Sequence, residues 1–370
     1  MRILLIGPHH AGGSIPPYLD VFTAALRFLG VQVDHLGTSG VPYDKEQDRF
    51  WTAERVRQEA EGMLADVDVN AYDLLSVHFG NLDVEQLLPQ LWPARRPPAV
   101  YHLHSLDWTL FTDHIPEPDL REAVNRGVVG MDAFVCFGTY GAERLETLAG
   151  PDAPRLVSWL PTTIPSGTLP RYPKDLAAAL EPSDPRPLGS LYGYATPWKD
   201  TENLIAACKR TKEPGRMIVA GPFWDDPSQA GLDLAAEVKG TTHGSTQLRV
   251  VPTYLDAAAR LALVTATDFA IFPYRTQPTF QGSGAIADYL AHGVPVLATD
   301  VANMAELIGD AGVVMEPANP QSLADAVDRF IHDVQHRKTL ASAARCHARR
   351  FSAVHHAAQC LRFYDTLIRR

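Results

Sequence analysis

Residues 272–300, FPYRTQPTFQGSGAIADYLAHGVPVLATD, place a small-residue turn and an amphipathic helix between two apolar strands. Gly282, Ser283 and Gly284 precede the helix, so its first backbone N–H groups lack partners and carry a partial positive charge. Such a helix start is a good site for phosphate. One turn further on, the carboxylate of Asp288 can accept hydrogen bonds from sugar hydroxyls. The stretch therefore predicts a nucleotide site at the end of a strand.

The composition narrows the classes of protein to consider. With 370 residues, 46% of them hydrophobic, the chain is long enough for two domains with full cores. The net charge of −10 argues against a nucleic-acid partner. Four scattered cysteines without CxxC spacing indicate reduced thiols rather than a metal site. The N-terminal MRILLIG is too short for a signal or a membrane span, so we expect a cytoplasmic protein without stable membrane association.

Apolar, β-rich runs alternate with helical segments in both halves of the chain. They cover residues 2–7, 31–36, 72–79, 99–105 and 132–138, and then 188–194, 216–222, 248–254, 269–274 and 294–300. This rhythm predicts an α/β protein with two doubly wound, Rossmann-like parallel sheets. The proline-rich segment between residues 160 and 188 predicts a connector. We therefore expect domains at 1–165 and 188–350, with a C-terminal helix, 352–370, packing back on the first.

In such a protein, the ligand site is expected where the carboxyl ends of the two sets of strands face each other. The first half offers two glycines and several polar side chains for this edge: His9, Gly12, Gly13, His102, His104 and Asp107. Alternation along the strand places His102 and His104 on one face, and His78 ends the neighbouring strand, which suggests a supporting position. The competing interpretation is an ordinary βα turn with structural histidines.

In the second half, Gly193 ends a strand and Lys199 stands at the start of the next helix, near Asp200. A cation at a helix N-terminus is unfavourable for the helix dipole. An anionic ligand would explain Lys199, although an exposed surface lysine is the simpler alternative.

This combination resembles the retaining GT-B glycosyltransferases, the large group that includes sucrose synthases and phosphatidylinositol mannosyltransferase. The resemblance covers nearly the whole chain and is most specific over 272–300 and MAELIGDAGVVMEPANPQSLADAVDRFI at 304–331. It implies that Asp288 holds the nucleotide ribose, where the family usually has Glu, and that Ser283 and Gly284 supply N–H groups to the diphosphate. Lys199 matches the family's diphosphate-binding lysine.

The sequence departs from the family pattern at two positions. Tyr194 stands where the family has an arginine that clamps the diphosphate, and a tyrosine lacks both the charge and the two-pronged hydrogen bonding. We expect Arg275 to reach the diphosphate instead. Phe280 stands where the family has an acidic residue that contacts the transferred sugar, and Gln277 or Gln281 is expected to substitute.

The resemblance also implies a mechanism. The sugar is transferred with retention, no protein nucleophile is needed, and the leaving diphosphate oxygen accepts the proton of the acceptor. Lys199 and the helix N-terminus stabilise the departing charge, His104 orients sugar and acceptor, and Gly12 and Gly13 match the family's glycine loop. We expect no cofactor and no metal, with a UDP- or GDP-linked sugar as donor. The Asp-x-Asp at 66–69 precedes a strand, at the wrong end of a parallel sheet.

The predicted acceptor is a small soluble molecule. The helical segment 44–64 mixes acidic and basic residues rather than forming a basic, lipid-binding face. The overall negative charge favours a cationic acceptor, an amino sugar or aminocyclitol, and we expect His9, His102 and Asp107 to bind it. The Ala-, Arg- and Pro-rich composition suits a GC-rich bacterial genome, and together with the departures from the donor motif it favours bacterial secondary metabolism. A nicotinamide-dependent dehydrogenase is disfavoured because the glycine fingerprint is absent. A nucleotide-sugar-binding GT-B protein without transferase activity, an epimerase or an auxiliary partner, remains the alternative.

Overall fold

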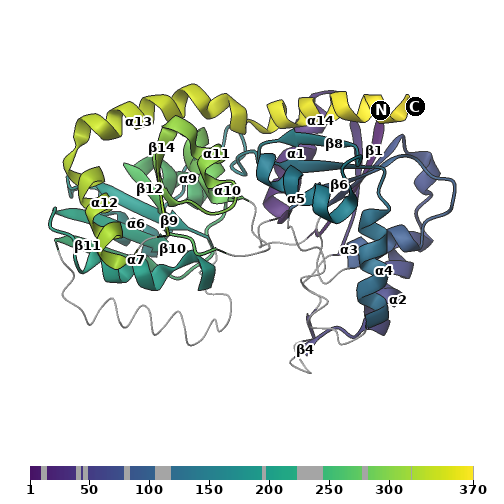
Figure 1. Ribbon diagram of the computed structural model, residues 1–370, viewed down its shortest axis with the longest axis horizontal. Coiled ribbons are helices and arrows are strands. Elements are labelled where there is room, and N and C mark those ends of the chain that lie inside the picture. The colour runs from purple at the N-terminus through teal and green to yellow at the C-terminus, as the bar shows by residue number, and fades with distance from the viewer. Residues whose placement is uncertain are drawn as a thin grey trace. The chain divides into compact units, whose positions relative to one another are not determined.

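The structure is a computed structural model in which two compact units can be described separately (Figure 1). Unit 1 contains Met1–Trp159 and Ala353–Arg370, and unit 2 contains Leu160–Gln277 and Gly282–Ser352. The description covers residues 1–9, 15–38, 43–44, 49–78, 84–104, 118–193, 197–222, 245–276, 282–317 and 319–369.

Unit 1 is built on a six-stranded parallel sheet in the order β2-β1-β5-β6-β7-β8. The strands are β1 (Arg2–Ile6), β2 (Gln32–Leu36), β5 (Leu74–His78), β6 (Ala99–Leu103), β7 (Ala133–Phe137) and β8 (Arg155–Ser158). The helices are α1 (Ile15–Phe28), α2 (Ala53–Ala65), α3 (Val84–Leu87), α4 (Pro118–Val129), α5 (Thr139–Ala149) and α14 (Ala353–Ile368), and β3 (Tyr43–Asp44) pairs with β4 (Arg49–Phe50). The direction of winding reverses between β1 and β5.

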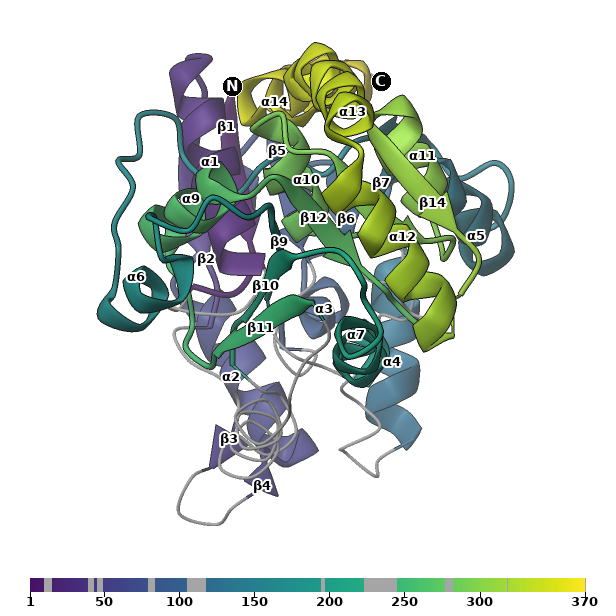
Figure 2. The ribbon, with the colours of Figure 1, turned by 90° about the vertical axis from the view of Figure 1, so that its left-hand side faces the viewer.

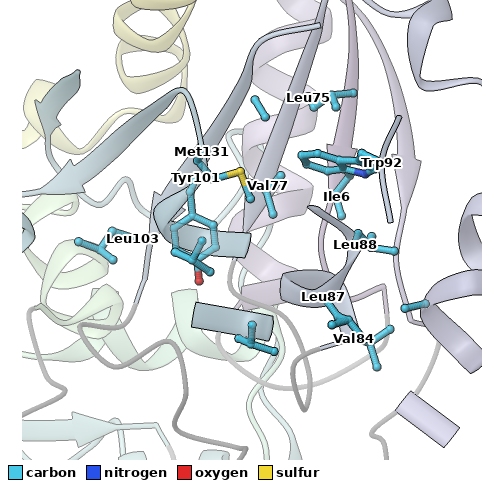
Figure 3. Close-up of a cluster of buried hydrophobic side chains, with 14 of the residues drawn as sticks. Ile6, Leu75, Val77, Val84, Leu87, Leu88, Trp92, Tyr101, Leu103 and Met131 are labelled. Carbon is cyan, nitrogen blue, oxygen red and sulfur yellow. The ribbon is translucent and has the colours of Figure 1, made fainter. Parts of the chain in front are cut away.

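The two faces of this sheet differ in chemistry. Successive side chains of a strand point to opposite faces. On one face, Leu75, Val77, Tyr101 and Leu103 join an apolar cluster with residues of α2, α3 and α4 (Figure 3). The intervening residues of β5 and β6 are polar and face the other side, which α1 and α14 cover.

The C-terminal helix α14 lies along α1 and β8 (Figure 1). It buries His356, Cys360, Tyr364 and Leu367, which recur at helical spacing on one face. Three of these four side chains carry a polar group, so this interface is more polar than an ordinary helix–sheet contact. Helix α14 belongs to unit 1 although unit 2 precedes it in the chain.

Unit 2 is built on a second six-stranded parallel sheet, in the order β11-β10-β9-β12-β13-β14. The strands are β9 (Leu188–Tyr192), β10 (Gly215–Ala220), β11 (Thr246–Val251), β12 (Phe269–Phe272), β13 (Val296–Thr299) and β14 (Gly312–Met315). The helices are α6 (Lys174–Leu180), α7 (Thr201–Cys208), α9 (Ala257–Ala266), α10 (Gly284–Ala291), α11 (Met304–Ile308), α12 (Pro320–His332) and α13 (Val334–His347). Figure 2 shows α6 and α9 on one side of these strands and α7 and α12 on the other.

The predicted fold class, two doubly wound parallel sheets, is confirmed, and all ten predicted strands are present. Strands β8 and β14 were not predicted, because RLVS and GVVM are short and lack a clear alternation. The proline-rich connector contains helix α6 and is part of unit 2. No helix in the described part of the chain has both the length and the apolar content that crossing a bilayer requires.

Candidate active site

The winding of the second sheet reverses between β9 and β12, and open α/β sheets bind ligands at this point, beyond the carboxyl ends of the strands. Strand β9 ends at Tyr192 and is followed by Gly193, whose φ of +118° strongly favours glycine. A Cβ on Gly193 would lie 2.4 Å from Nζ of Lys199, and one on Gly221 would lie 2.0 Å from the carbonyl oxygen of Gly193. Glycine at both positions lets the backbone and a lysine approach closely at the switch point.

Lys199 ends a short 3₁₀ turn, Pro197–Lys199, just before α7. Its half-buried side chain brings the amine against the backbone of Gly193. Burial lowers the pKa of this amine from 10.5 to about 7, because the charged form loses water. An anion bound beside Nζ would restore the charged form, so the site suits a diphosphate group.

Arg275 pairs with carboxylates at the start of α7. Its guanidinium donates to Asp200 and lies 3.7 Å from a carboxylate oxygen of Glu202. Asp200 is the N-cap of α7 with φ +52°, and its carboxylate forms this ion pair rather than capping the helix. Contact between Arg275 and a diphosphate stays a prediction, and it would require the guanidinium to leave these two partners or to bridge from them.

The N-terminus of α10 has the form that the sequence predicts. Ser283 is its N-cap and accepts a hydrogen bond from the backbone N–H of Ile286 at 3.3 Å, and its hydroxyl also contacts the hydroxyl of Tyr274. No described heavy atom lies within 4 Å of the place that a Cβ on Gly284 would take. Among the described residues, nothing fills the space beside this position in the first turn, whose backbone N–H groups are the ones that a ligand could reach.

Asp288 is completely buried, and its carboxylate is surrounded by donors from unit 2. Oδ1 accepts from the hydroxyl of Thr162 at 2.7 Å and the backbone N–H of Thr163 at 2.6 Å. Oδ2 accepts from the hydroxyls of Thr163 and Tyr192, and Nε of Arg260 lies 3.9 Å away. The carboxylate thus ties the connector to β9, and binding of a ribose would have to displace these donors.

Unit 1 places His104 at the carboxyl end of β6, partly exposed, with its Nε2 3.2 Å from Nδ1 of His78. His102, by contrast, is fully buried and has both ring nitrogens engaged, by Tyr18 at 3.1 Å and by Tyr364 at 2.6 Å. His102 therefore lies behind His104, and direct contact with an acceptor would require this network to open. His104 is the member of the pair with access to the strand edge.

His9 lies at the carboxyl edge of β1. Its ring is exposed, and its Nδ1 is 3.1 Å from Nδ1 of His35 on β2, whose Nε2 contacts the carbonyl oxygen of Gly7. Its backbone N–H donates to Thr38 at 2.7 Å. His9 is thus available to a ligand, as an acceptor-binding role requires.

The remaining predicted positions lie outside the described residues: Gly12, Gly13, Asp107, Tyr194, Gln277, Phe280 and Gln281. Their roles, including the substitution of Gln277 or Gln281 for the missing acidic side chain, stay predictions.

Sequence reasoning missed the partners of the predicted residues. Thr163 and Arg260 reach Asp288 from 125 residues upstream and from α9, and nothing in their local sequence marks them. In unit 1, a signal was present: His356, Cys360 and Tyr364 follow one another at four-residue spacing on an otherwise apolar helix face. Such a polar stripe on a buried face indicates a hydrogen-bonded network.

The Asp-x-Asp motif has local structural roles. Asp66 is the C-cap of α2, and Asp68 caps a 3₁₀ turn by accepting from the backbone N–H of Asn70 at 3.0 Å. Both precede β5 and so lie at its amino end. Within the described ranges, no three His, Cys, Asp or Glu side chains gather in a way that could hold a metal ion.

The two parallel sheets, with polar groups beyond the switch point of the second, define a doubly wound α/β protein. Comparisons with known proteins narrow this class. Residues 188–333 match the family model described as "Glycosyl transferases group 1". This match covers both strands that flank the switch point of unit 2.

Whole-chain comparisons point the same way. The chain is 28% identical over 366 residues to the D-inositol 3-phosphate glycosyltransferase of Nocardia farcinica, covering 92% of this chain and 74% of that one. Its fold is similar to sucrose-phosphate synthase from Thermosynechococcus elongatus, with TM-score 0.72, 18% identity and coverage of 99% and 98%. It is also similar to HepE from Anabaena, solved with UDP and glucose, with TM-score 0.69, 20% identity and coverage of 99% and 100%. These findings confirm the resemblance and support a GT-B glycosyltransferase.

Proposed function

We propose that the protein transfers a sugar, with retention of configuration, from a nucleotide-diphosphate sugar to a small polyhydroxylated acceptor. The observation that carries this proposal is the amine of Lys199 packed against Gly193 at the switch point of unit 2. Burial of a lysine amine disfavours its charged form, and an anionic ligand would compensate for the cost.

The donor is proposed to bind unit 2 as a UDP- or GDP-linked sugar. Lys199 and the N–H groups at Ser283 and Gly284 would hold the diphosphate, with Arg275 a further source of positive charge. The solved HepE structure with UDP and glucose supports a uridine nucleotide as the first donor to try. The transferred sugar is proposed to be a hexose.

The proposed chemistry needs no protein nucleophile. The bond between the anomeric carbon and the diphosphate oxygen breaks, the acceptor hydroxyl attacks from the same face, and the leaving oxygen takes the hydroxyl proton. Lys199 and the α10 N-terminus would stabilise the negative charge that develops on that oxygen, without the help of a metal ion. His104 would orient the hydroxyl groups of sugar and acceptor.

The acceptor is proposed to be a cyclitol or amino sugar, bound by unit 1 near His9 and His104. The relative from Nocardia farcinica is named for a phosphorylated cyclitol, which favours a ring polyol. The net charge of −10 favours an aminocyclitol over a phosphorylated one, because long-range attraction speeds encounter with a cation. The departures from the family's donor motif at Tyr194 and Phe280 favour a reaction of bacterial secondary metabolism.

The experiment is a transfer assay with matched acceptors. The protein is incubated with UDP- or GDP-hexoses and with inositol, inositol phosphate, an aminocyclitol and an amino sugar, and release of nucleoside diphosphate is measured. The anomeric configuration of the product is then read by NMR. We expect acceptor-dependent release that is highest with a cationic acceptor and a product with the donor's configuration. Nucleotide binding without release in the presence of any acceptor would instead support the non-catalytic alternative, and an inverted product would contradict retention.

A further inference from the structure

Nine side chains of unit 1 form one continuous hydrogen-bonded network beneath the sheet edge. They come from α1, β5, β6, β8 and α14: Tyr18, Ser76, His78, His102, His104, Ser158, His356, Gln359 and Tyr364. Four of them are histidines whose pKa burial lowers, to about 3 for His104 and His356, and well below the usual value for the other two. All four rings are therefore neutral near pH 7, and each has one donor nitrogen and one acceptor nitrogen.

The direction of the network can be derived from its end on α14. The hydroxyl of Ser158 donates to Oε1 of Gln359 at 2.9 Å, because an amide oxygen only accepts. Since its single proton is used, Ser158 must accept from Nδ1 of His356, 2.8 Å away. His356 therefore carries its proton on Nδ1, and its Nε2 is an acceptor.

The same reasoning carries across α1 to β6. Nε2 of His356 accepts from the hydroxyl of Tyr18 at 2.9 Å, and the sulfur of Cys360 lies 3.7 Å from the same nitrogen. The oxygen of Tyr18 then accepts from Nδ1 of His102 at 3.1 Å. His102 therefore has Nε2 as its acceptor, and this nitrogen receives the hydroxyl proton of Tyr364 at 2.6 Å.

The last steps lead to the strand edge. With the proton of Tyr364 used, Ser76 donates to the oxygen of Tyr364 at 3.2 Å and accepts from Nε2 of His78 at 3.1 Å. His78 then has Nδ1 as its acceptor, and Nε2 of His104 must donate to it across 3.2 Å. One assignment of protons thus satisfies every contact in the network except the 3.3 Å approach of Ser76 to Nε2 of His102, because the single proton of Ser76 is already used.

We propose that this network fixes the tautomer of His104, so that Nε2 carries the proton and Nδ1 presents a lone pair at the edge of the sheet, with His78 as the positioning residue. Nδ1 of His104 has no hydrogen bond to the part of the chain that the structure describes. A lone pair there accepts a hydrogen bond from a hydroxyl group and rejects a carbonyl or phosphate oxygen. The ligand group that meets His104 is therefore a hydrogen-bond donor, a hydroxyl or an amine, and not a bare oxygen acceptor.

The consequence for catalysis rests on the proposed function, whereas the tautomer does not. If unit 1 binds a polyol beside His104, the fixed lone pair orients one hydroxyl without removing its proton, because the low pKa makes His104 a weak base. The direction of the hydrogen bonds in the network is set at Gln359 on α14. This helix therefore influences the site without lining it.

The test is the tautomeric state of the histidines in the full-length protein, read from long-range ¹H–¹⁵N correlation spectra after selective ¹⁵N-histidine labelling. Signals are assigned by substituting one histidine at a time. At pH 7.5 we expect protons on Nε2 of His104 and His78, and on Nδ1 of His102 and His356. A Nδ1–H tautomer or an imidazolium at His104 would overturn the proposal. This result needs neither a substrate nor activity, so it is separate from the fate of the proposed function.

Matched variants test the role of His78. In His78→Asn, the amide oxygen can still accept from Nε2 of His104, so the tautomer should persist. In His78→Leu no acceptor remains, and the Nε2–H signal of His104 should be lost or become a mixture. Tyr364→Phe is the second control. It removes the hydroxyl that donates to Nε2 of His102, but Ser76, 3.3 Å from this nitrogen, can donate in its place, so the tautomers of His78 and His104 should stay the same. An unchanged His104 tautomer in His78→Leu would show that His78 does not fix it. If the enzyme is active, His78→Leu should lower kcat with little change in the KM for the donor, whereas His78→Asn and Tyr364→Phe should not.

Discussion

The two units bury polar groups at the edges of similar sheets, but in opposite ways. Unit 1 buries neutral rings and hydroxyls that satisfy one another in a chain, around His78, His102 and His356. Unit 2 buries a carboxylate, Asp288, with hydroxyl and N–H donors, and has a guanidinium, that of Arg260, 3.9 Å away. The comparison teaches that a network of neutral groups fixes the direction of its hydrogen bonds, whereas a buried charge holds the segments around it together through strong local hydrogen bonds.

The largest expected difference between the two units is in their stability at acidic pH. An unfolded histidine has a pKa of about 6.5, and the four network histidines have lower pKa values in the folded state, down to about 3. The unfolded state therefore binds more protons, and the free energy of unfolding of unit 1 should fall as the pH drops below 6.5. Each histidine should contribute about 1.4 kcal/mol per pH unit. Unit 2 has no buried histidine among its described residues, so it should resist acid longer.

Buried cysteines report on each unit separately. Cys136 and Cys360 lie in unit 1 and Cys208 in unit 2. Labelling with a disulfide reagent that reacts at low pH, followed by mass spectrometry, should show the first two becoming accessible at a higher pH than Cys208. Equal labelling of all three across the range from pH 7 to 4 would contradict the comparison.

The next effect concerns the buried charge. Asp288→Ala should lower the free energy of unfolding of unit 2 by about 3–5 kcal/mol, because Thr162, Thr163 and Tyr192 lose their acceptor and Arg260 loses its counter-charge. Urea unfolding followed by Cys208 labelling measures it. Asp288→Asn, which keeps one acceptor oxygen, is the matched control and should cost less. A loss of nucleotide affinity with stability unchanged would show that Asp288 serves the ligand rather than the connector.

A smaller effect is expected from Lys199. Its pKa of about 7 means that the amine is largely neutral above pH 7, and a bound diphosphate would favour the charged form. Nucleoside diphosphate affinity should therefore fall as the pH rises above 7, by up to about tenfold per pH unit. Calorimetry in two buffers of different ionisation enthalpy should detect proton uptake on binding.

Lys199→Arg sharpens this prediction, because arginine stays charged and should give an affinity that is flat with pH. Lys174→Met, at the exposed start of α6, is the control for removing a lysine and should leave the pH dependence as it is. A pH dependence that survives in Lys199→Arg would assign it to another group.

The smallest effect is a gain in stability. Ala302, in the loop after β13, has a φ of +50°, which costs a residue with a Cβ about 1–2 kcal/mol. Ala302→Gly should therefore stabilise unit 2 by roughly 0.5–1 kcal/mol after the added freedom of the unfolded chain is subtracted. Ala305→Gly, inside α11, should instead destabilise by about the same amount. Urea midpoints of the two variants on opposite sides of the wild type would confirm the strain at Ala302.

The fold could be predicted from the sequence because strand and helix periods are local properties, and both sheets repeat them. The switch-point features followed for the same reason: Gly193 directly follows β9, and Lys199 and the α10 N-cap at Ser283 lie in the segments that lead from β9 and β12 into the next helix. What could not be predicted are contacts between distant segments. The burial of Asp288 by Thr162 and Thr163 depends on tertiary packing that no local pattern encodes. The polar stripe on α14 indicates a network, but it does not reveal that His356 meets Tyr18.

The most direct test of the account is a thermal-shift panel with UDP, GDP, dTDP, ADP and NAD on the wild type and on Lys199→Met. A ligand at about a hundred times its Kd stabilises the folded state by roughly 2.7 kcal/mol, which is readily measured. The account predicts that one nucleoside diphosphate, with UDP or GDP first, raises the midpoint and that Lys199→Met abolishes the rise. A response to NAD alone, or a diphosphate response that is unchanged in Lys199→Met, would contradict a donor site at the switch point of unit 2.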